Sequence, residues 1–149
     1  MDFTNGIEIT EILNEETKRK YVLEFAPFLF YHHTIKDIVN LSEKIAKRAI
    51  VISARKEDKV VGFIAYYRND DVNRIAYITL IVVHPKFREN GIGKVLLQSA
   101  IKDCLNKDYK IIRLEVDNAN YNAIKLYQNI GFQIEKAASE HSTYYICYL

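Results

Sequence analysis

The sequence predicts an α/β (α+β) domain built on a mixed, mainly antiparallel sheet. Segments of helical and of strand periodicity follow one another in the order βααβββαβαββ along the 149 residues. Two pairs of neighbouring strands are separated by short polar turns, as in antiparallel hairpins. A strand–helix–strand unit over residues 72–116 predicts a right-handed crossover between two parallel strands.

In the N-terminal half, residues 6–12 alternate apolar with polar side chains and predict a strand. Residues 14–33 open with an N-cap residue and an acidic turn, and predict a helix that Pro27 kinks or breaks. Residues 34–49 predict a second helix, and residues 49–70 predict a hairpin around an acidic turn. The residues expected on the apolar face of the second helix are Ile35, Ile38, Leu41, Ile45 and Ala49.

Strand and helix periodicities also alternate through the C-terminal half. The predicted elements, in chain order, are a strand over 72–83, a helix over 91–107, a strand over 109–116, a helix over 120–131 that ends at a glycine, and a closing hairpin over 132–139 and 142–149. These segments complete the predicted order.

Composition favours one cytoplasmic domain over residues 1–149, because 49% hydrophobic and 27% charged residues are ordinary values for a globular protein. A net charge of +2 is too small to indicate a nucleic-acid partner. The longest uncharged apolar stretch, residues 25–31, is too short to span a membrane, and the N-terminus lacks the features of a secretory signal. The two cysteines suggest no disulfide framework, and four scattered histidines without a carboxylate cluster predict no metal site.

The stretch RENGIGKVLL, residues 88–97, lies between a predicted buried strand and the crossover helix. The first amides of a helix are unpaired and sit at the positive end of its dipole, so an anion is favoured there. The stretch fits neither the P-loop pattern nor the Rossmann fingerprint, because Arg88, Val95 and Leu96 occupy positions that those motifs reserve for other residues. It reads as RxxGxG, which on its own indicates either a phosphate site or a simple turn at a helix start.

Two stretches, ITLIVVHPKFRENGIGKVLLQSAI and LEVDNANYNAIKLYQNIGF, together resemble the GNAT family of N-acetyltransferases. The first contains the family signature [Q/R]xxGx[G/A] after the fourth predicted strand. The second matches a pattern found in many members, at Glu115, Asn120, Ala123, Tyr127, Gly131 and Phe132. The motifs cover about residues 78–132, and the order of elements fits nearly the whole chain.

The resemblance implies a three-layer fold with helices on both faces of a sheet that is splayed between the fourth and fifth strands. It also implies acetyl-CoA as the co-substrate, with its pyrophosphate on the amides of residues 88–94. Backbone atoms of the fourth strand would bond the pantetheine arm, and a backbone N–H near Val83 would stabilise the developing oxyanion. The residues expected to bind the co-substrate are Val82, Val83, Arg88, Glu89, Asn90, Gly91, Ile92, Gly93, Lys94, Asn120, Ala123 and Tyr127.

Acyl transfer to an amine requires that the ammonium lose a proton and that the departing thiolate gain one. The resemblance implies Tyr127 as general acid and Glu115, twelve residues earlier, as base, directly or through water. The alternative for Tyr127 is an aromatic that packs on the sheet, and the alternative for Glu115 is a structural role in an open strand. Asn120 is expected to cap its helix.

The acceptor is predicted to be a primary amine, either a peptide N-terminus or a small molecule. The first helix pair shapes the acceptor pocket in the family, so Tyr31, His32 and their neighbours are candidate acceptor contacts. The short loop at 139–142 argues against a peptide. The tyrosines of the closing hairpin are expected to line this pocket, a homodimer contact or the core; they are Tyr144, Tyr145 and Tyr148.

Two other readings remain open from the sequence. A non-catalytic acyl-CoA-binding module would keep RENGIG without needing Tyr127 and Glu115. A nucleic-acid-binding module would use the tyrosine-rich sheet, which the modest charge argues against.

Overall fold

The computed structural model of the protein describes residues 3–4, 6–30 and 34–149. Its strands are β1 (Phe3–Thr4), β2 (Ile7–Ile12), β3 (Ile50–Lys56), β4 (Lys59–Tyr67), β5 (Ile75–Val83), β6 (Ile111–Asp117), β7 (Gln133–Ala137) and β8 (Ser142–Tyr148). Its helices are α1 (Glu15–Phe25), α2 (Ile35–Arg48), α3 (Ile92–Asn106) and α4 (Tyr121–Ile130), with short 3₁₀ turns η1 (Ala26–Phe28) and η2 (Pro85–Phe87). The predicted order is therefore confirmed, and only the two-residue β1 was not predicted.

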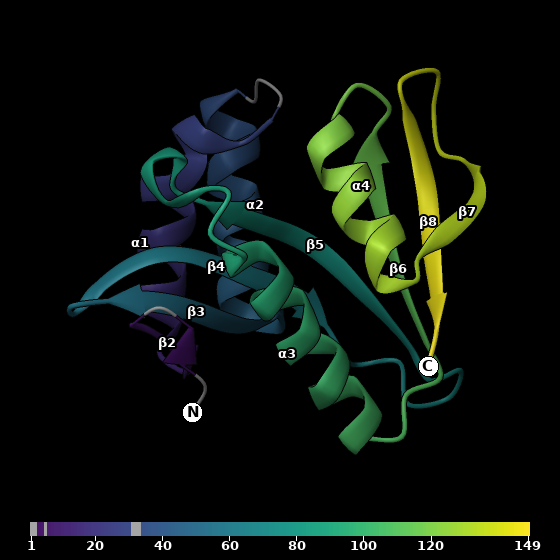
Figure 1. Cartoon of the computed structure of the whole chain (residues 1–149), viewed down its shortest axis with the longest axis horizontal. Coiled ribbons are helices and arrows are strands. Elements are labelled where there is room, and N and C mark those ends of the chain that lie inside the picture. Colours follow the sequence, from purple (N-terminus) through teal and green to yellow (C-terminus); the bar gives the residue numbers. More distant parts are fainter. Residues whose placement is uncertain (1–2, 5, 31–33) are drawn as a thin grey trace.

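The strands form one eight-stranded sheet in the order β1-β2-β3-β4-β5-β6-β8-β7. Every neighbouring pair is antiparallel except β5 and β6, which are parallel and joined through α3. Helices α1 and α2 cover one face of the sheet, and α3 and α4 cover the other (Figure 1). The mixed, mainly antiparallel sheet with helices on both faces is thus confirmed.

Local signals set the ends of the helices. The Asn14 side chain accepts a hydrogen bond from the Thr17 N–H at 3.0 Å and begins α1, and Pro27 lies in η1, where α1 has ended. Thr34 caps α2 in the same way. The predicted apolar face of α2 was wrong at its first residue, because Ile35 is 86% exposed. The helix turns Ile38, Ser42, Ile45 and Ala46 toward the sheet instead.

A β-bulge at Thr79 divides β5 into two halves. Against β4, Ala65 pairs with Leu80 but Tyr66 pairs with Ile78, so Thr79 is an extra residue. The parallel pairing with β6 ends at the same point, at Ile78 opposite Leu114. Beyond it, within the described part of the chain, β5 stays paired with β4 alone, and the two parallel strands run apart (Figure 1). The predicted splay is confirmed.

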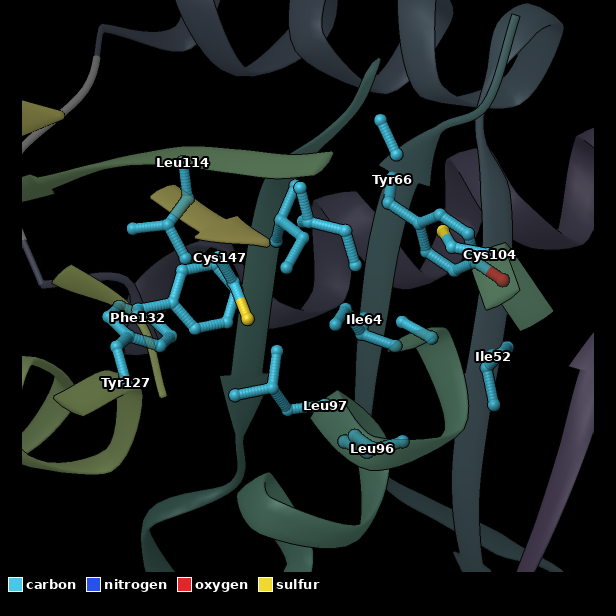
Figure 2. Packing of buried hydrophobic residues seen from close by; sticks show 14 of the residues in the cluster. Ile52, Ile64, Tyr66, Leu96, Leu97, Cys104, Leu114, Tyr127, Phe132 and Cys147 are labelled. Atoms are coloured by element: carbon cyan, nitrogen blue, oxygen red, sulfur yellow. The ribbon is translucent and has the colours of Figure 1, made fainter. Parts of the chain in front are cut away.

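Two apolar clusters hold the layers together, one on each face of the sheet. Under α3 and α4, buried residues of the central strands meet Leu96, Leu97, Tyr127 and Phe132, as Figure 2 shows. Under α1 and α2, a second cluster is centred on Phe63 and Ile45, which are fully buried. The first cluster contains residues of both β5 and β6, so packing under α3 and α4 holds the separation of the two strands in place.

A buried polar network fixes the C-terminal part of α3 to β4. The Tyr66 hydroxyl donates to Asp103 Oδ2 at 2.7 Å, and Arg68 Nε donates to the same oxygen at 2.9 Å. Burial first, and then the Asp103 carboxylate, raise the pKa of Tyr66 above its ordinary value. The hydroxyl therefore stays protonated and acts as a donor.

Asp103→Ala should lower the free energy of unfolding by about 2 kcal/mol, because it leaves the buried Tyr66 hydroxyl without its acceptor. Urea unfolding measures the change. Lys102→Ala, at an exposed position of the same helix, is the matched control and should lie within about 0.5 kcal/mol of the parent protein. Equal stability of the two variants would contradict a structural role for the network.

Both cysteines are buried, and burial raises the pKa of Cys104 from 9.0 to about 12. Iodoacetamide at pH 8 should leave both thiols unmodified in the native protein and alkylate both in urea, which mass spectrometry detects. The pKa of Cys104 is higher in the folded protein than in the unfolded chain. The stability that comes from burying the protonated thiol is therefore complete below about pH 9 and is lost as pH rises toward 12. Rapid alkylation of native Cys104 would show that the helix opens locally.

Candidate active site

A groove of about 1100 Å³ lies between the separated halves of β5 and β6. Its walls come from the bulged end of β5, the start of α3, the end of β6, helix α4, residues 27–30 in and after η1, and Asp37 and Leu41 of α2. The groove therefore follows directly from the bulge at Thr79. It is lined from both faces of the sheet, because α3 and α4 contribute from one side and η1 and α2 from the other (Figure 1).

The bulged half of β5 presents an open strand edge to this groove. The His84 N–H donates to the Val61 carbonyl at 2.8 Å, so these two residues form a hydrogen-bonded pair of the ladder between β4 and β5. Hydrogen-bonded pairs alternate in an antiparallel ladder, so Val82 directs its backbone groups at Phe63 of β4. Ile81 and Val83 direct theirs away from β4 and into the groove. Of the two predicted backbone contacts, Val83 thus faces the groove, whereas Val82 faces the neighbouring strand.

Helix α3 begins at the groove without a side chain to cap it. Its N-cap is Gly91 at φ 77°, a left-handed conformation that favours glycine, and no side chain accepts from the first amides. The first intrahelical bond joins the Val95 N–H to the Gly91 carbonyl at 3.1 Å. The amides of residues 92–94 precede it, at the positive end of the helix dipole. A Cβ built on Gly91 meets nothing within 4 Å, so space for an anion lies beside them.

The side chains of the preceding loop turn toward the protein main chain. Arg88 donates from Nε to the Val83 carbonyl at 3.0 Å and from Nη2 to the Phe28 carbonyl at 3.1 Å. Asn90 Nδ2 donates to the Phe87 carbonyl at 3.2 Å, and Glu89 adopts φ 66°. At residues 88–94, where the sequence predicts an anion site, the start of α3 thus presents backbone amides, with the Lys94 side chain exposed beside them.

Tyr127 lies on α4 with its ring in the core and lines the groove. The residue is 5% exposed, and its ring centroid is 5.8 Å from that of Phe132 (Figure 2). Asn120 caps the helix by accepting from the Ala123 N–H at 3.4 Å, as predicted. The predicted packing role and the predicted position beside the groove therefore coexist in the same tyrosine.

Glu115 lines the same groove from the opposite face of β6. Its neighbours Leu114 and Val116 are buried under α4, and strand alternation turns Glu115 the other way, where it is exposed. The Ser142 hydroxyl donates to Glu115 Oε2 at 2.6 Å, and Ser142 is itself within 2.9 Å of the Ser139 hydroxyl. Sequence reasoning missed Ser142, because only the pairing of β6 with β8 brings it beside Glu115.

Gly62 is a second residue that sequence reasoning missed. A Cβ at this position of β4 would lie 2.8 Å from the Val82 carbonyl oxygen and 3.2 Å from Val83 Cα. Only glycine therefore lets β4 approach the bulged half of β5 this closely. The available signal was the isolated glycine within the strand pattern VVGFIAYY.

The remaining predicted contacts are distributed more widely. Tyr31, His32 and His33 lie outside the described residues, whereas the adjacent Phe30 lines the groove and is 52% exposed. In the closing hairpin Tyr145 is core, Tyr148 is exposed, and Tyr144 pairs with Glu115 in the sheet.

Neither a metal centre nor a membrane span is found in the part of the chain that the structure describes. Residues 3–4, 6–30 and 34–149 contain no group of three or more metal-ligating side chains. They also contain no helix long and apolar enough to cross a bilayer.

The sequence and the fold of the chain are similar to those of known proteins. The model of the acetyltransferase (GNAT) family matches residues 8–132. N-alpha-acetyltransferase 30 of Homo sapiens is 40% identical over 63 residues, which make up 42% of this chain but only 17% of the human protein. The chain thus corresponds to a small part of that relative.

Two solved structures share the fold over almost the whole chain. The PaiA N-acetyltransferase of Thermoplasma acidophilum, solved in complex with coenzyme A, is 18% identical with a TM-score of 0.76, covering 96% of this chain and 99% of that one. The ribosomal-protein-S18-alanine N-acetyltransferase of Escherichia coli is 17% identical with a TM-score of 0.77, covering 95% and 93%.

Gly62→Ala should displace the bulged half of β5 and weaken coenzyme A binding about tenfold, because the new Cβ overlaps the Val82 carbonyl. Isothermal titration calorimetry measures the affinity. Val61→Ala is the control, since it removes buried apolar volume from the same strand without touching the open edge. It should lose stability yet bind coenzyme A with unchanged affinity, whereas unchanged binding by Gly62→Ala would contradict the close-approach explanation.

Proposed function

The chain belongs to the acetyltransferase (GNAT) family, and we propose that it acetylates the α-amine of a peptide N-terminus, using acetyl-CoA by direct attack in a ternary complex. The observation that carries this proposal is a single groove with two unlike ends. One end offers free backbone amides and an open strand edge. The other brings Tyr127 and Glu115 to the same groove from opposite faces of the sheet.

The donor end fits a coenzyme A thioester group by group. The amides of residues 92–94 and the open space beside Gly91 suit its pyrophosphate. The backbone groups that Ile81 turns into the groove suit the amides of its pantetheine arm. Acetyl-CoA supplies an activated acetyl group at the end of that arm. The Val83 N–H then points to where negative charge develops on the acetyl oxygen.

Glu115 is proposed to receive the proton of the acceptor. An alkyl ammonium has a pKa near about 10 and is protonated at neutral pH, so it needs a base before it can attack. The Ser142 hydroxyl holds Glu115 Oε2 at 2.6 Å and fixes the orientation of the carboxylate. Oε1 is left to take the proton, directly or through one water molecule.

Tyr127 is proposed to return a proton to the departing thiolate. Its ring packs in the core against Phe132 and the residue lines the groove, a position that the packing of a phenylalanine ring would preserve. A fixed acid near the sulfur avoids release of a free thiolate. A non-catalytic acyl-CoA-binding module would need neither this residue nor Glu115.

The acceptor class rests on two relatives and on the shape of the acceptor end. The names of the human relative and of the E. coli neighbour specify N-terminal acetylation of polypeptides. The groove is bordered by an apolar wall suited to the first side chain of a peptide, made of Phe28, Leu29 and Phe30 in and after η1 and of Leu41 in α2. A small amine is the competing acceptor.

Tyr127→Phe should lower kcat by about 10²-fold or more while the affinity for coenzyme A stays within about twofold, because only the acid is removed. Single-turnover release of coenzyme A with a saturating acceptor measures the chemical step. Tyr121→Phe, 75% exposed on the same helix, is the matched control and should behave as the parent protein. An unchanged single-turnover rate in Tyr127→Phe would remove this residue from the mechanism.

The acceptor is identified with the parent protein and a panel of peptides, polyamines, amino sugars and aminoglycosides. Release of coenzyme A with free-amine peptides, and none with the same peptides blocked at the α-amine, is the expected result. Activity with small amines alone would replace the peptide by a small molecule and leave the donor end unchanged. Coenzyme A binding without turnover on any acceptor would favour the non-catalytic module.

A further inference from the structure

We propose that Arg88 is a positioning residue that ties the acceptor wall to the donor strand, rather than a ligand of the pyrophosphate. This inference rests on the proposed function, because it assigns the two sides of the groove to donor and acceptor. It departs from the expectation that the charge of this arginine serves an anion. The side chain joins Val83 at the end of β5 to Phe28 in η1, across 60 residues of sequence between Arg88 and Phe28.

The two bonds use separate arms of the guanidinium. Nε donates to the Val83 carbonyl at 3.0 Å, and Nη2 donates to the Phe28 carbonyl at 3.1 Å. The planar guanidinium fixes the direction of its donors, so satisfying both carbonyls sets the distance between η1 and the open edge of β5. A single-point donor such as lysine cannot impose this spacing.

A ring contact beside Arg88 joins the same two parts of the protein. The His84 ring lies 4.6 Å from that of Phe28 and 5.9 Å from that of Phe87. His84 Nδ1 also accepts from the Lys86 N–H at 3.1 Å, which fixes the ring at the start of η2. The loop between β5 and α3 therefore contacts η1 through side-chain packing and through Arg88.

Arg88 also changes what the open edge offers to the donor. Val83 turns its carbonyl into the groove, and Arg88 Nε already occupies that carbonyl. The backbone groups of Ile81 remain available to the pantetheine arm, and the N–H of Val83 remains available to the acetyl oxygen. Because residues 92–94 provide amides for the pyrophosphate, the anion has a binding site that does not involve the arginine side chain.

The position of η1 should therefore depend on Arg88, and the acceptor should be affected more than the donor. Arg88→Gln should raise the KM for the acceptor about tenfold, because charge-assisted bonds to two carbonyls are lost. The affinity for acetyl-CoA should change less than about threefold. Arg88→Lys should recover only part of the acceptor KM, since one ammonium cannot reproduce the fork.

The test compares Arg88→Gln and Arg88→Lys with Arg55→Gln. Arg55 also donates to a carbonyl, that of Asp58, but in the β3–β4 turn away from the groove walls, so this variant should match the parent protein. Steady-state KM values for acceptor, acetyl-CoA and acetyl-pantetheine are measured for each variant. A loss of acetyl-CoA affinity of tenfold or more, with acetyl-pantetheine and acceptor unaffected, would make Arg88 a phosphate ligand and overturn the proposal.

Hydrogen exchange of the free protein provides a readout that needs no activity. In Arg88→Gln the amides of residues 26 and 28–30 should exchange faster, including the Leu29 N–H that donates to the Ala26 carbonyl at 3.3 Å. Exchange elsewhere should match the parent protein, which separates loss of this link from general destabilisation. Unchanged exchange at 26–30 would overturn the proposal even if the protein is an active acetyltransferase. A parent protein that binds no coenzyme A would refute the proposed function and leave this measurement valid.

Discussion

One extra residue in one strand controls the geometry of this protein. Thr79 has no partner of its own in the ladder between β4 and β5, and the parallel pairing of β5 with β6 stops one residue before it. The bulge reverses which side chains of β5 face which layer, so Ile78 and Ile81 both reach the α3–α4 side. Without it, β6 would continue along β5 and no backbone would be left to bind a ligand. Gly62 contributes to the same geometry, since the lack of a Cβ lets β4 approach closely the half of β5 that is not paired with β6.

The polar groups around the groove divide into those that the fold satisfies and those that it leaves open. Arg88 covers the Val83 carbonyl, Ser142 holds one oxygen of Glu115, and Asn120 caps α4. Within the described residues, the start of α3, the outward backbone groups of Ile81 and the Val83 N–H receive no such support. Open groups at a groove are favourable sites for a ligand, because unpaired backbone donors and acceptors are costly when they are buried away from water. The pattern of satisfied and open groups thus outlines the extended, anionic molecule proposed as donor.

Sequence reasoning succeeded where structure is set by neighbours in the chain. Asn14 and Asn120 were readable as caps, and the turn before β4 and the glycine after α4 were equally local. It failed where contacts between distant segments decide. Ile35 fits the helical period yet lies outside the core. Val82 and Val83 were expected to act alike, yet only Val83 turns its backbone groups into the groove. Ser142 meets Glu115 only through pairing of β6 with β8. The family motif located the site, while the register of the strands determines which atoms it presents.

The network at the far end of α3 has a consequence for binding at the near end. The hydrogen bonds among Tyr66, Asp103 and Arg68 secure the last turns of the helix to β4. Nearer its start, the side chains of Leu96 and Leu97 are fully buried. The helix is therefore a rigid support, already in place before any ligand arrives. The proposed contacts to its first amides would require no folding of the binding segment, so little conformational entropy would be lost on association and affinity at this end would reflect pre-organisation rather than induced order.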